Sequence, residues 1–188
     1  MDYYKRALEL NDETVKNRRY FHTNAETGLH MPMACAYMMD KLTKYGLTPS
    51  RCGEGVTATV GNGGKVLLLR ADMDALPMPE ESGLPFACPT GKEAHACGHD
   101  FHTAAVFGAA LLLQERKEEL QGNVKILFQP AEESSHGAET VLETGVFSDV
   151  TAIFGLHTAA YLPVGTLGIR AGSVMAAVDR FELNITGT

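Results

Sequence analysis

Apolar side chains recur at helical spacing in two stretches of the first fifty residues. The first stretch, "ETVKNRRYFH", predicts a helix that begins near Asn11 or Asp12. The second, "LHMPMACAYMMDKLTKYG", predicts a helix closed by Gly46, since glycine is favoured just after a helix end. We interpret the methionines of this second helix as core packing, because Met fills irregular gaps.

From residue 55 onward the pattern changes to short apolar runs separated by turn residues and helical stretches. Strands are predicted in "GVTATVGNGGKVLLLRA", which holds two joined at Asn62-Gly63, and in "GNVKILFQ", "TAIFGLH", "GTLGIRAG" and "DRFELNIT". Continuous apolar runs such as "GNVKILFQ" and "TAIFGLH" are typical of strands covered on both faces. Helices are predicted in "DFHTAAVFGAALLLQERKEEL", with Asp100 as its N-cap, and in "GAETVLETGVF".

This alternation of strands and helices predicts an α/β protein, built as three α/β/α layers around an open mixed sheet. A hairpin at Asn62-Gly63 argues against a purely parallel sheet. A length of 188 residues suits one domain, or one domain and a fragment of another.

Composition narrows the choice of function. The net charge is −7 and no basic stripe offsets it, which argues against a nucleic-acid partner. No apolar run is long enough to span a bilayer, so no membrane partner is expected. The N-terminus "MDYYKRALELND" lacks the apolar core of a signal peptide, and we expect a cytoplasmic protein. The irregular spacing of its four cysteines indicates thiols or metal ligands rather than disulfides.

Chemically active side chains follow three of the predicted buried strands. "KVLLLRA" leads into Asp72 and Asp74, "VKILFQPA" into Glu132 and Glu133, and "AIFGL" into His157. In open α/β sheets, ligands bind beyond the carboxyl ends of the strands. Each residue alone has a structural explanation: turn formation for the aspartates, a helix start for the glutamates and a core histidine for His157. Their shared position favours a functional site.

The densest cluster is "HACGHDFH", residues 95–102, which holds three of the seven histidines. Cys97 and His99 flank Gly98, which allows a tight backbone turn that directs both side chains toward one point. Thiolate, imidazole and carboxylate together suit zinc, manganese, nickel or cobalt. We therefore predict a metal role for at least two members of this cluster.

The adjacent acids Glu132 and Glu133 indicate hydrolysis rather than a closed structural metal site. One acid can coordinate metal while its neighbour takes a proton from water. A structural zinc site would leave this pair unexplained.

Four segments together resemble the amidohydrolase branch of the zinc-peptidase superfamily: "LLLRADMDALPMPEESGLPF", "HACGHDFHT", "LFQPAEESSHGAETVLETGVF" and "FGLH". That branch includes hippurate hydrolases, N-acyl-amino-acid amidohydrolases (aminoacylases) and indole-acetyl-amino-acid hydrolases. The similarity runs from "RRYFH" to the last predicted strand.

The resemblance implies a site with two divalent metal ions and assigns its residues. Cys97, His99, Glu133 and His157 resemble metal ligands, with Cys97 as a bridge between the ions. Glu132 resembles the general base and acid. Two further roles are supportive: Asp74 resembles a carboxylate that orients a ligating imidazole, and Asp100 and His102 support the cluster.

The implied reaction is hydrolysis of the amide bond of an N-acyl amino acid. By the same resemblance, the partner is a small-molecule substrate, and a homo-oligomer is compatible with it. Ala25 departs from the family's usual His-x-x-Pro-Glu pattern, a change expected to alter loop stiffness only.

The resemblance also implies a domain division. Residues 1–178 correspond to the N-terminal part of the catalytic metal-binding domain, incomplete at its C-terminus. Residues 179–188 correspond to the start of a strand that leads, in the family, to a lid or dimerisation domain and then to a last metal-ligating histidine. No residue here matches that histidine, so we expect weaker metal binding and impaired activity in this fragment.

Three alternatives remain open from the sequence. The first is a non-catalytic remnant that folds and binds metal without turnover. The second is a structural zinc module built on Cys97, His99 and two other ligands. The third, a nucleotide-binding protein, is least favoured because "GNGG" lies in a predicted hairpin and no G-x-G-x-x-G segment opens a helix.

Overall fold

The computed structural model describes residues 2–134, 136–177, 179 and 181–187. The chain divides into two units, Met1–Thr158 and Ala159–Thr188, which are considered separately. All helices and strands of the described residues lie in the first unit. No helix among the described residues is long and apolar enough to cross a membrane.

Three helices open the first unit: α1 (Tyr3–Glu9), α2 (Asn11–Thr23) and α3 (Pro32–Lys44). The sequence analysis missed α1, which is capped by the Asp2 carboxylate through backbone N–H groups of the first turn. The predicted start of α2 near Asn11 is confirmed, although Asn11 is its first residue rather than a side-chain cap. Gly46 follows α3 with a positive φ of 79°, so its predicted position past the helix end is also confirmed.

Five strands form one mixed sheet in the order β1-β2-β4-β3-β5. They are β1 (Ser50–Cys52), β2 (Gly55–Gly61), β3 (Lys65–Asp72), β4 (Gly122–Gln129) and β5 (Val150–Gly155). Strands β3, β4 and β5 run parallel, whereas β2 runs antiparallel to both β1 and β4. The predicted open mixed sheet is therefore confirmed.

The predicted hairpin between β2 and β3 is wrong in its pairing. β4 lies between them and pairs with both, antiparallel to β2 and parallel to β3. The turn signal correctly reverses the chain at residues 62–64, but a turn fixes only direction. The central position goes to β4, whose apolar residues on both faces bury best between two neighbours. The hairpin actually formed joins β1 to β2.

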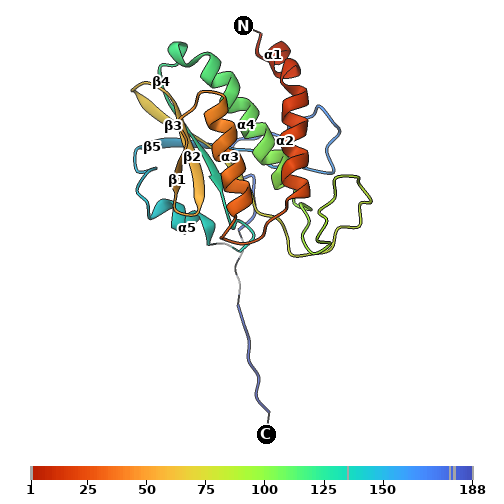
Figure 1. Cartoon of the computed structure of the whole chain (residues 1–188). Coiled ribbons are helices and arrows are strands. Elements are labelled where there is room, and N and C mark those ends of the chain that lie inside the picture. Colours follow the sequence, from red (N-terminus) through yellow and green to blue (C-terminus); the bar gives the residue numbers. More distant parts are fainter. Residues whose placement is uncertain (1, 135, 178, 180, 188) are drawn as a thin grey trace. The chain divides into compact units, whose positions relative to one another are not determined.

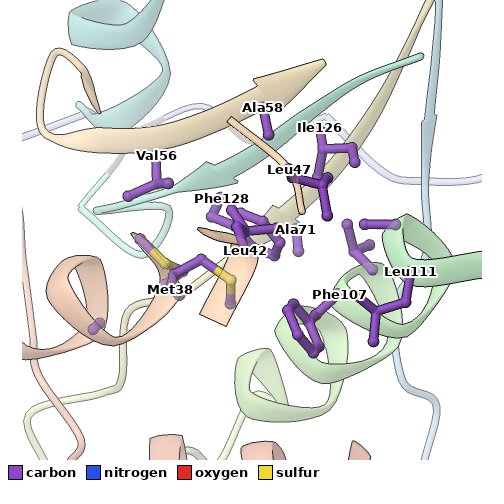
Figure 2. Packing of buried hydrophobic residues seen from close by; sticks show 14 of the residues in the cluster. Met38, Leu42, Leu47, Val56, Ala58, Ala71, Phe107, Leu111, Ile126 and Phe128 are labelled. Carbon is purple, nitrogen blue, oxygen red and sulfur yellow. The ribbon is translucent and has the colours of Figure 1, made fainter. Parts of the chain in front are cut away.

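Helices cover both faces of the sheet. On one face, α2, α3 and α4 (His99–Glu115) enclose the main core (Figure 1). Figure 2 shows Met38 and Leu42 of α3 and Phe107 of α4 packed toward Ile126 and Phe128 of β4. On the other face, Leu127 packs with Val141 of the short helix α5 (Gly137–Leu142). The alternation of Ile126, Leu127 and Phe128 between the faces follows strand geometry and supports the predicted three layers. A short 3₁₀ turn, Lys117–Glu119, precedes β4.

Three strand predictions need correction. β5 exists but is an exposed edge strand rather than a buried one: Ile153 is 69% and Phe154 54% exposed. Residues 165–172 form no strand. Within residues 179–186 the described ones are not in a strand either, and Arg180 lies outside the described residues. An alternating apolar pattern gives strand propensity, but a strand also needs a hydrogen-bonded neighbour, and none of the described residues pairs with these segments.

The three parallel strands, β3, β4 and β5, determine where the candidate site residues lie. Asp72 at the end of β3 pairs with Gln129 at the end of β4, and β5 ends beside the same edge. The segments that leave these three strands, together with the start of α4, therefore meet at one edge of the sheet.

Candidate metal centre

His99 is the centre of the cluster at this edge. It is the first residue of α4, its side chain is 1% exposed, and its Nδ1 donates to the backbone carbonyl of Asp74 at 2.7 Å. A carbonyl oxygen can only accept, so Nδ1 carries a proton. In the neutral ring, Nε2 then presents a lone pair, and this atom has no hydrogen-bond partner among the described residues.

Gly98 explains how the chain reaches this position. Its φ of 89° lies in the left-handed region, and a Cβ at this site would overlap the hydroxyl of Thr158. Gly98 is also the N-cap of α4, so the predicted cap at Asp100 is wrong. Asp100 instead lies in the first turn, where its buried carboxylate pairs with side chains of α2.

Cys97 and His157 approach His99 from two different segments. The Cys97 Sγ lies 3.4 Å from the His157 Nε2. The His157 Nδ1 donates to the Thr158 carbonyl at 2.7 Å, so Nε2 is the unprotonated nitrogen and can accept the Cys97 S–H. Ligand atoms of Cys97, His99 and His157 all lie within 4.8 Å of one another.

Glu132 and Glu133 complete a second group around the same imidazole. Their carboxylate oxygens lie 3.9 Å and 3.7 Å from the His99 Nε2. Asp74 positions this pair, because its two carboxylate oxygens accept the backbone N–H groups of Glu132 and Glu133, each at 3.0 Å. The preceding Ala131 is buried with a φ of 51°, an uncommon left-handed conformation for a residue with a side chain. The backbone is thus held in a costly turn that directs two acids to one point.

Asp72 and His102 form a buried pair on the other side of His99. The Asp72 Oδ1 accepts from the His102 Nδ1 at 2.7 Å, and the Asp72 Oδ2 pairs with Arg70 at 2.6 Å. The His102 Nε2 accepts the backbone N–H of Thr158 at 2.9 Å. Asp72, His99 and His102 also satisfy the spacing of a metal site, but this hydrogen bond already uses the free nitrogen of His102. We therefore assign His102 to holding the segment that carries His157.

Electrostatics within the cluster follow from burial and crowded acids. Burial, together with the neighbouring Glu133, raises the pKa of the Cys97 thiol to about 12. Burial alone would raise the pKa of Asp72, but the His102 hydrogen bond and Arg70 outweigh it and lower that pKa to about 2. Burial likewise would lower the pKa of His99, yet its contact with Asp74 and the charge of Asp72 raise it.

These features fit a bound divalent cation. The unpartnered Nε2 of His99 faces Glu132 and Glu133 as well as Asp72, which is already paired with Arg70, so a proton or a metal ion at this point would lower the repulsion between the two glutamates. A divalent ion would also stabilise the Cys97 thiolate, which is otherwise disfavoured. Sulfur, imidazole and carboxylate donors together suit zinc and the neighbouring transition metals.

All six residues selected from the sequence lie at this one edge: Asp74, Cys97, His99, Glu132, Glu133 and His157. The sequence analysis noted Asp72 at the end of its strand without assigning it a role, and it did not consider Arg70 or Thr158. Asp72 had a usable signal, because it ends the strand that leads directly to the selected Asp74. Thr158 had none, since its contribution is a backbone N–H group.

A second polar cluster adjoins the first and was not predicted. Asp100 pairs with Arg18 and with the Nδ1 of His22, each at 2.7 Å. The Nε2 of His22 contacts Glu80 at 2.8 Å. The Arg18 guanidinium also lies 4.4 Å from the ring centroid of Phe101. This cluster fastens the segment after β3 to α2 and α4.

Comparison with known proteins links these features to one family. Residues 68–186 match the profile of Peptidase family M20/M25/M40. The chain is 55% identical over 124 residues to N-acetylcysteine deacetylase of Bacillus subtilis, covering 66% of this chain and 33% of that protein. It is 42% identical over 179 residues to IAA-amino acid hydrolase ILR1-like 5 of Arabidopsis thaliana, covering 94% of this chain and 41% of that protein.

A solved structure shows the same architecture. The YXEP protein of Bacillus subtilis, described as a dinuclear metal-binding peptidase from the M20 family, superposes with a TM-score of 0.83 at 40% identity. The match covers 86% of this chain and 47% of that one. The chain thus spans between a third and a half of the length of these relatives.

Proposed function

Because the chain belongs to Peptidase family M20/M25/M40, we propose that it supplies part of a metal-dependent site that hydrolyses the amide bond of N-acyl amino acids. The observation that carries this proposal is the unpartnered Nε2 of His99, which faces Glu132 and Glu133 within 4 Å. The relatives named as an N-acetylcysteine deacetylase and an IAA-amino acid hydrolase support the choice of substrate class.

We propose Cys97, His99, Glu133 and His157 as ligands of two divalent metal ions. The dinuclear centre described for the YXEP protein supports the number of ions. Metal ions, when bound, polarise the carbonyl of the scissile amide and make water a stronger acid. The donor set accepts zinc, manganese, nickel and cobalt, so metal analysis must identify the native ion.

Glu132 is the proposed general base. Its side chain is 42% exposed, compared with 27% for Glu133, so Glu132 is the acid more open to solvent and substrate. Its carboxylate would take a proton from the attacking water as oxygen bonds to the amide carbon. The same proton then passes to the departing nitrogen as the C–N bond breaks, which releases the acid and the free amino acid.

Asp74 is the proposed positioning residue for this step. Its side chain is fully buried and holds the backbone of both glutamates, while its carbonyl fixes the tautomer of His99. A base works efficiently only when it is held within hydrogen-bond reach of its proton, so this clamp serves the chemistry through Glu132.

Substitution of the base tests the proposal. In Glu132→Gln, turnover of N-acetyl and N-benzoyl amino acids should fall by about 10²–10⁴-fold, the usual contribution of a general base. Metal content, measured by elemental analysis, should be retained. Glu118→Gln, an exposed acid in the 3₁₀ turn, is the matched control and should behave like the unmodified chain.

Two results would count against this function. Unchanged turnover in Glu132→Gln would place the base elsewhere. Bound metal without turnover in the unmodified chain would favour the alternative of a metal-binding chain that is not catalytic by itself.

A further inference from the structure

A groove of about 390 Å³ lies between α2 and α3, which run side by side in Figure 1. Every residue that lines it belongs to one of these helices or to the residue that ends α2, and none belongs to the candidate metal centre. The rings of Tyr20 on α2 and Tyr37 on α3 stack here, with centroids 3.5 Å apart and planes 8° from parallel. Aromatic surface therefore joins the two walls of the groove.

The α3 wall has already used its polar groups. The Lys41 ammonium donates to the Glu13 carboxylate at 2.6 Å, so this buried charge is balanced within the chain. The Tyr37 hydroxyl donates to the Asn17 side chain at 2.6 Å. These bonds fix the α3 wall in advance, which lowers the ordering cost of binding a ligand.

The α2 wall, in contrast, presents donors that are still available. Lys16, Arg19 and Tyr20 share one face of the helix, since residues three and four apart are neighbours on its surface. Lys16 and Arg19 are exposed, and neither side chain forms an ion pair with another described residue. The Arg19 guanidinium lies 5.0 Å from the ring centroid of Phe86, a contact that leaves its N–H groups free to donate.

The charge at the groove is positive although the chain as a whole carries −7. No acid is among the described residues that line it. The two acids that act on its tyrosines and lysine are both engaged: Glu13 by Lys41, and Glu26 by backbone N–H groups at the start of α3. An anion that enters the groove therefore meets cations whose charge is not already balanced.

Cationic head groups beside aromatic rings suit a ligand with an anionic head and a flat apolar body. The planar guanidinium of Arg19 can donate two parallel hydrogen bonds to a carboxylate, and Lys16 adds a second positive charge. We propose that this groove binds an aromatic carboxylate, with the carboxylate at Lys16 and Arg19 and the ring against Tyr20 and Tyr37. The volume lies within the range of small-molecule sites. This site goes beyond the proposed function, because none of its residues takes part in the proposed hydrolysis.

Three small probes test the two parts of the proposal separately. Benzoate has both the ring and the charge, benzamide keeps the ring without the charge, and acetate keeps the charge without the ring. A chelator is added to the full chain, so that no metal ion can hold the carboxylate. Ligand-observed NMR titration at low salt should then show binding of benzoate, and binding of benzamide and of acetate at least fivefold weaker. Added sodium chloride should weaken benzoate binding, because salt screens exposed charges.

Substitutions locate the bound benzoate. Lys16→Gln and Arg19→Gln should each weaken its binding at least fivefold without unfolding the chain, since both side chains are exposed. Lys117→Gln is the matched control, because it removes one positive charge from an exposed lysine outside the groove. The proposal is overturned if benzoate does not bind, or if benzamide or acetate binds as tightly. It is also overturned if neither Lys16→Gln nor Arg19→Gln weakens benzoate binding more than Lys117→Gln does.

Discussion

His99 and Asp100 are neighbours in the first turn of α4, yet they serve two different kinds of polar cluster. Around Asp100, each side chain has a close partner: Arg18 and His22 lie 2.7 Å from the Asp100 carboxylate, and His22 lies 2.8 Å from Glu80. The Arg18 Nε is within ion-pair distance of Asp100, although it makes no well-aligned hydrogen bond among the described residues. Around His99, the Nε2 atom has no hydrogen-bond partner among the described residues, and the nearest Glu132 and Glu133 oxygens lie 3.7–3.9 Å from it. Both clusters are rich in charge and each is built on a buried residue of α4, although Glu132, Glu133 and His157 of the His99 cluster are exposed.

The difference lies in how close the partners are: 2.7–2.8 Å in the Asp100 cluster, compared with 3.7–3.9 Å between the His99 Nε2 and the carboxylates around it. A buried cluster whose charges satisfy one another stabilises a particular arrangement of the chain. A cluster whose donors converge on a buried nitrogen without close contact leaves room for a group from outside the chain, such as a metal ion. We therefore interpret the Asp100 cluster as structural and the His99 cluster as the functional site.

The largest expected effect is a loss of stability when the Asp100 cluster is broken. Asp100→Asn removes a buried charge and leaves Arg18 and His22 without their anion, so unfolding of the metal-free chain should require about 3–5 kcal/mol less. Urea denaturation in the presence of a chelator measures this. Asp149→Asn, which removes an exposed partner of Lys125, is the control and should cost much less. Equal losses for the two variants would contradict a structural role for the Asp100 cluster.

The second prediction concerns the His99 cluster, where a substitution should weaken metal binding without lowering stability. Glu133→Gln should weaken metal binding by at least about 10–100-fold, the range measured even for residues that only support a ligand. The stability of the metal-free chain should stay constant or rise, because one of the crowded carboxylates loses its charge. Chelator competition measures the first quantity and denaturation the second. Glu143→Gln is an exposed control. A large loss of metal-free stability in Glu133→Gln would make the two clusters alike.

The smallest expected effect is the loss of stability at acidic pH that comes from Glu80. Burial would raise the pKa of Glu80, but hydrogen bonds from Ser82, His22 and the Cys88 amide outweigh it and lower the pKa from 4.5 to about 2. A depressed carboxylate stabilises the fold above its unfolded pKa, so this contribution, about 1–2 kcal/mol, is present above pH 4.5 and is lost as the pH falls toward 2. The free energy of unfolding, measured by urea denaturation at several pH values between 6 and 3, should therefore change less with pH for Glu80→Gln than for the unmodified chain. The same pH dependence for both proteins would show that Glu80 does not belong to the Asp100 cluster.

Much of the site could be predicted because its residues follow predicted elements. Glu132, Glu133 and His157 come after strands whose parallel direction places their ends together. The Asp100 cluster could not be predicted in the same way. Arg18, His22, Glu80 and Asp100 come from segments up to 82 residues apart, and no local pattern distinguishes them from ordinary surface charges.

Errors in the predicted fold have a common physical cause. The hairpin signal at Asn62-Gly63 gave the right chain reversal and the wrong neighbour, since β4 inserts between β2 and β3. "TAIFGLH" was predicted to be buried, but β5 has a neighbour on one side only among the described strands. Local patterns determine propensity, whereas strand order and exposure depend on pairing between distant segments.

The sequence by itself determined the α/β class, most element positions and the set of candidate ligands, because periodicity and motif spacing are local properties of the chain. Only the tertiary structure decided which of these polar residues are satisfied. In the folded chain, His102 bonds to Thr158 and Asp72, and Asp100 pairs with Arg18 and His22. The His99 Nε2 has no partner among the described residues and faces Glu132 and Glu133. Satisfaction of a buried polar atom depends on partners that folding brings from distant segments, so it cannot be inferred from neighbours in the sequence.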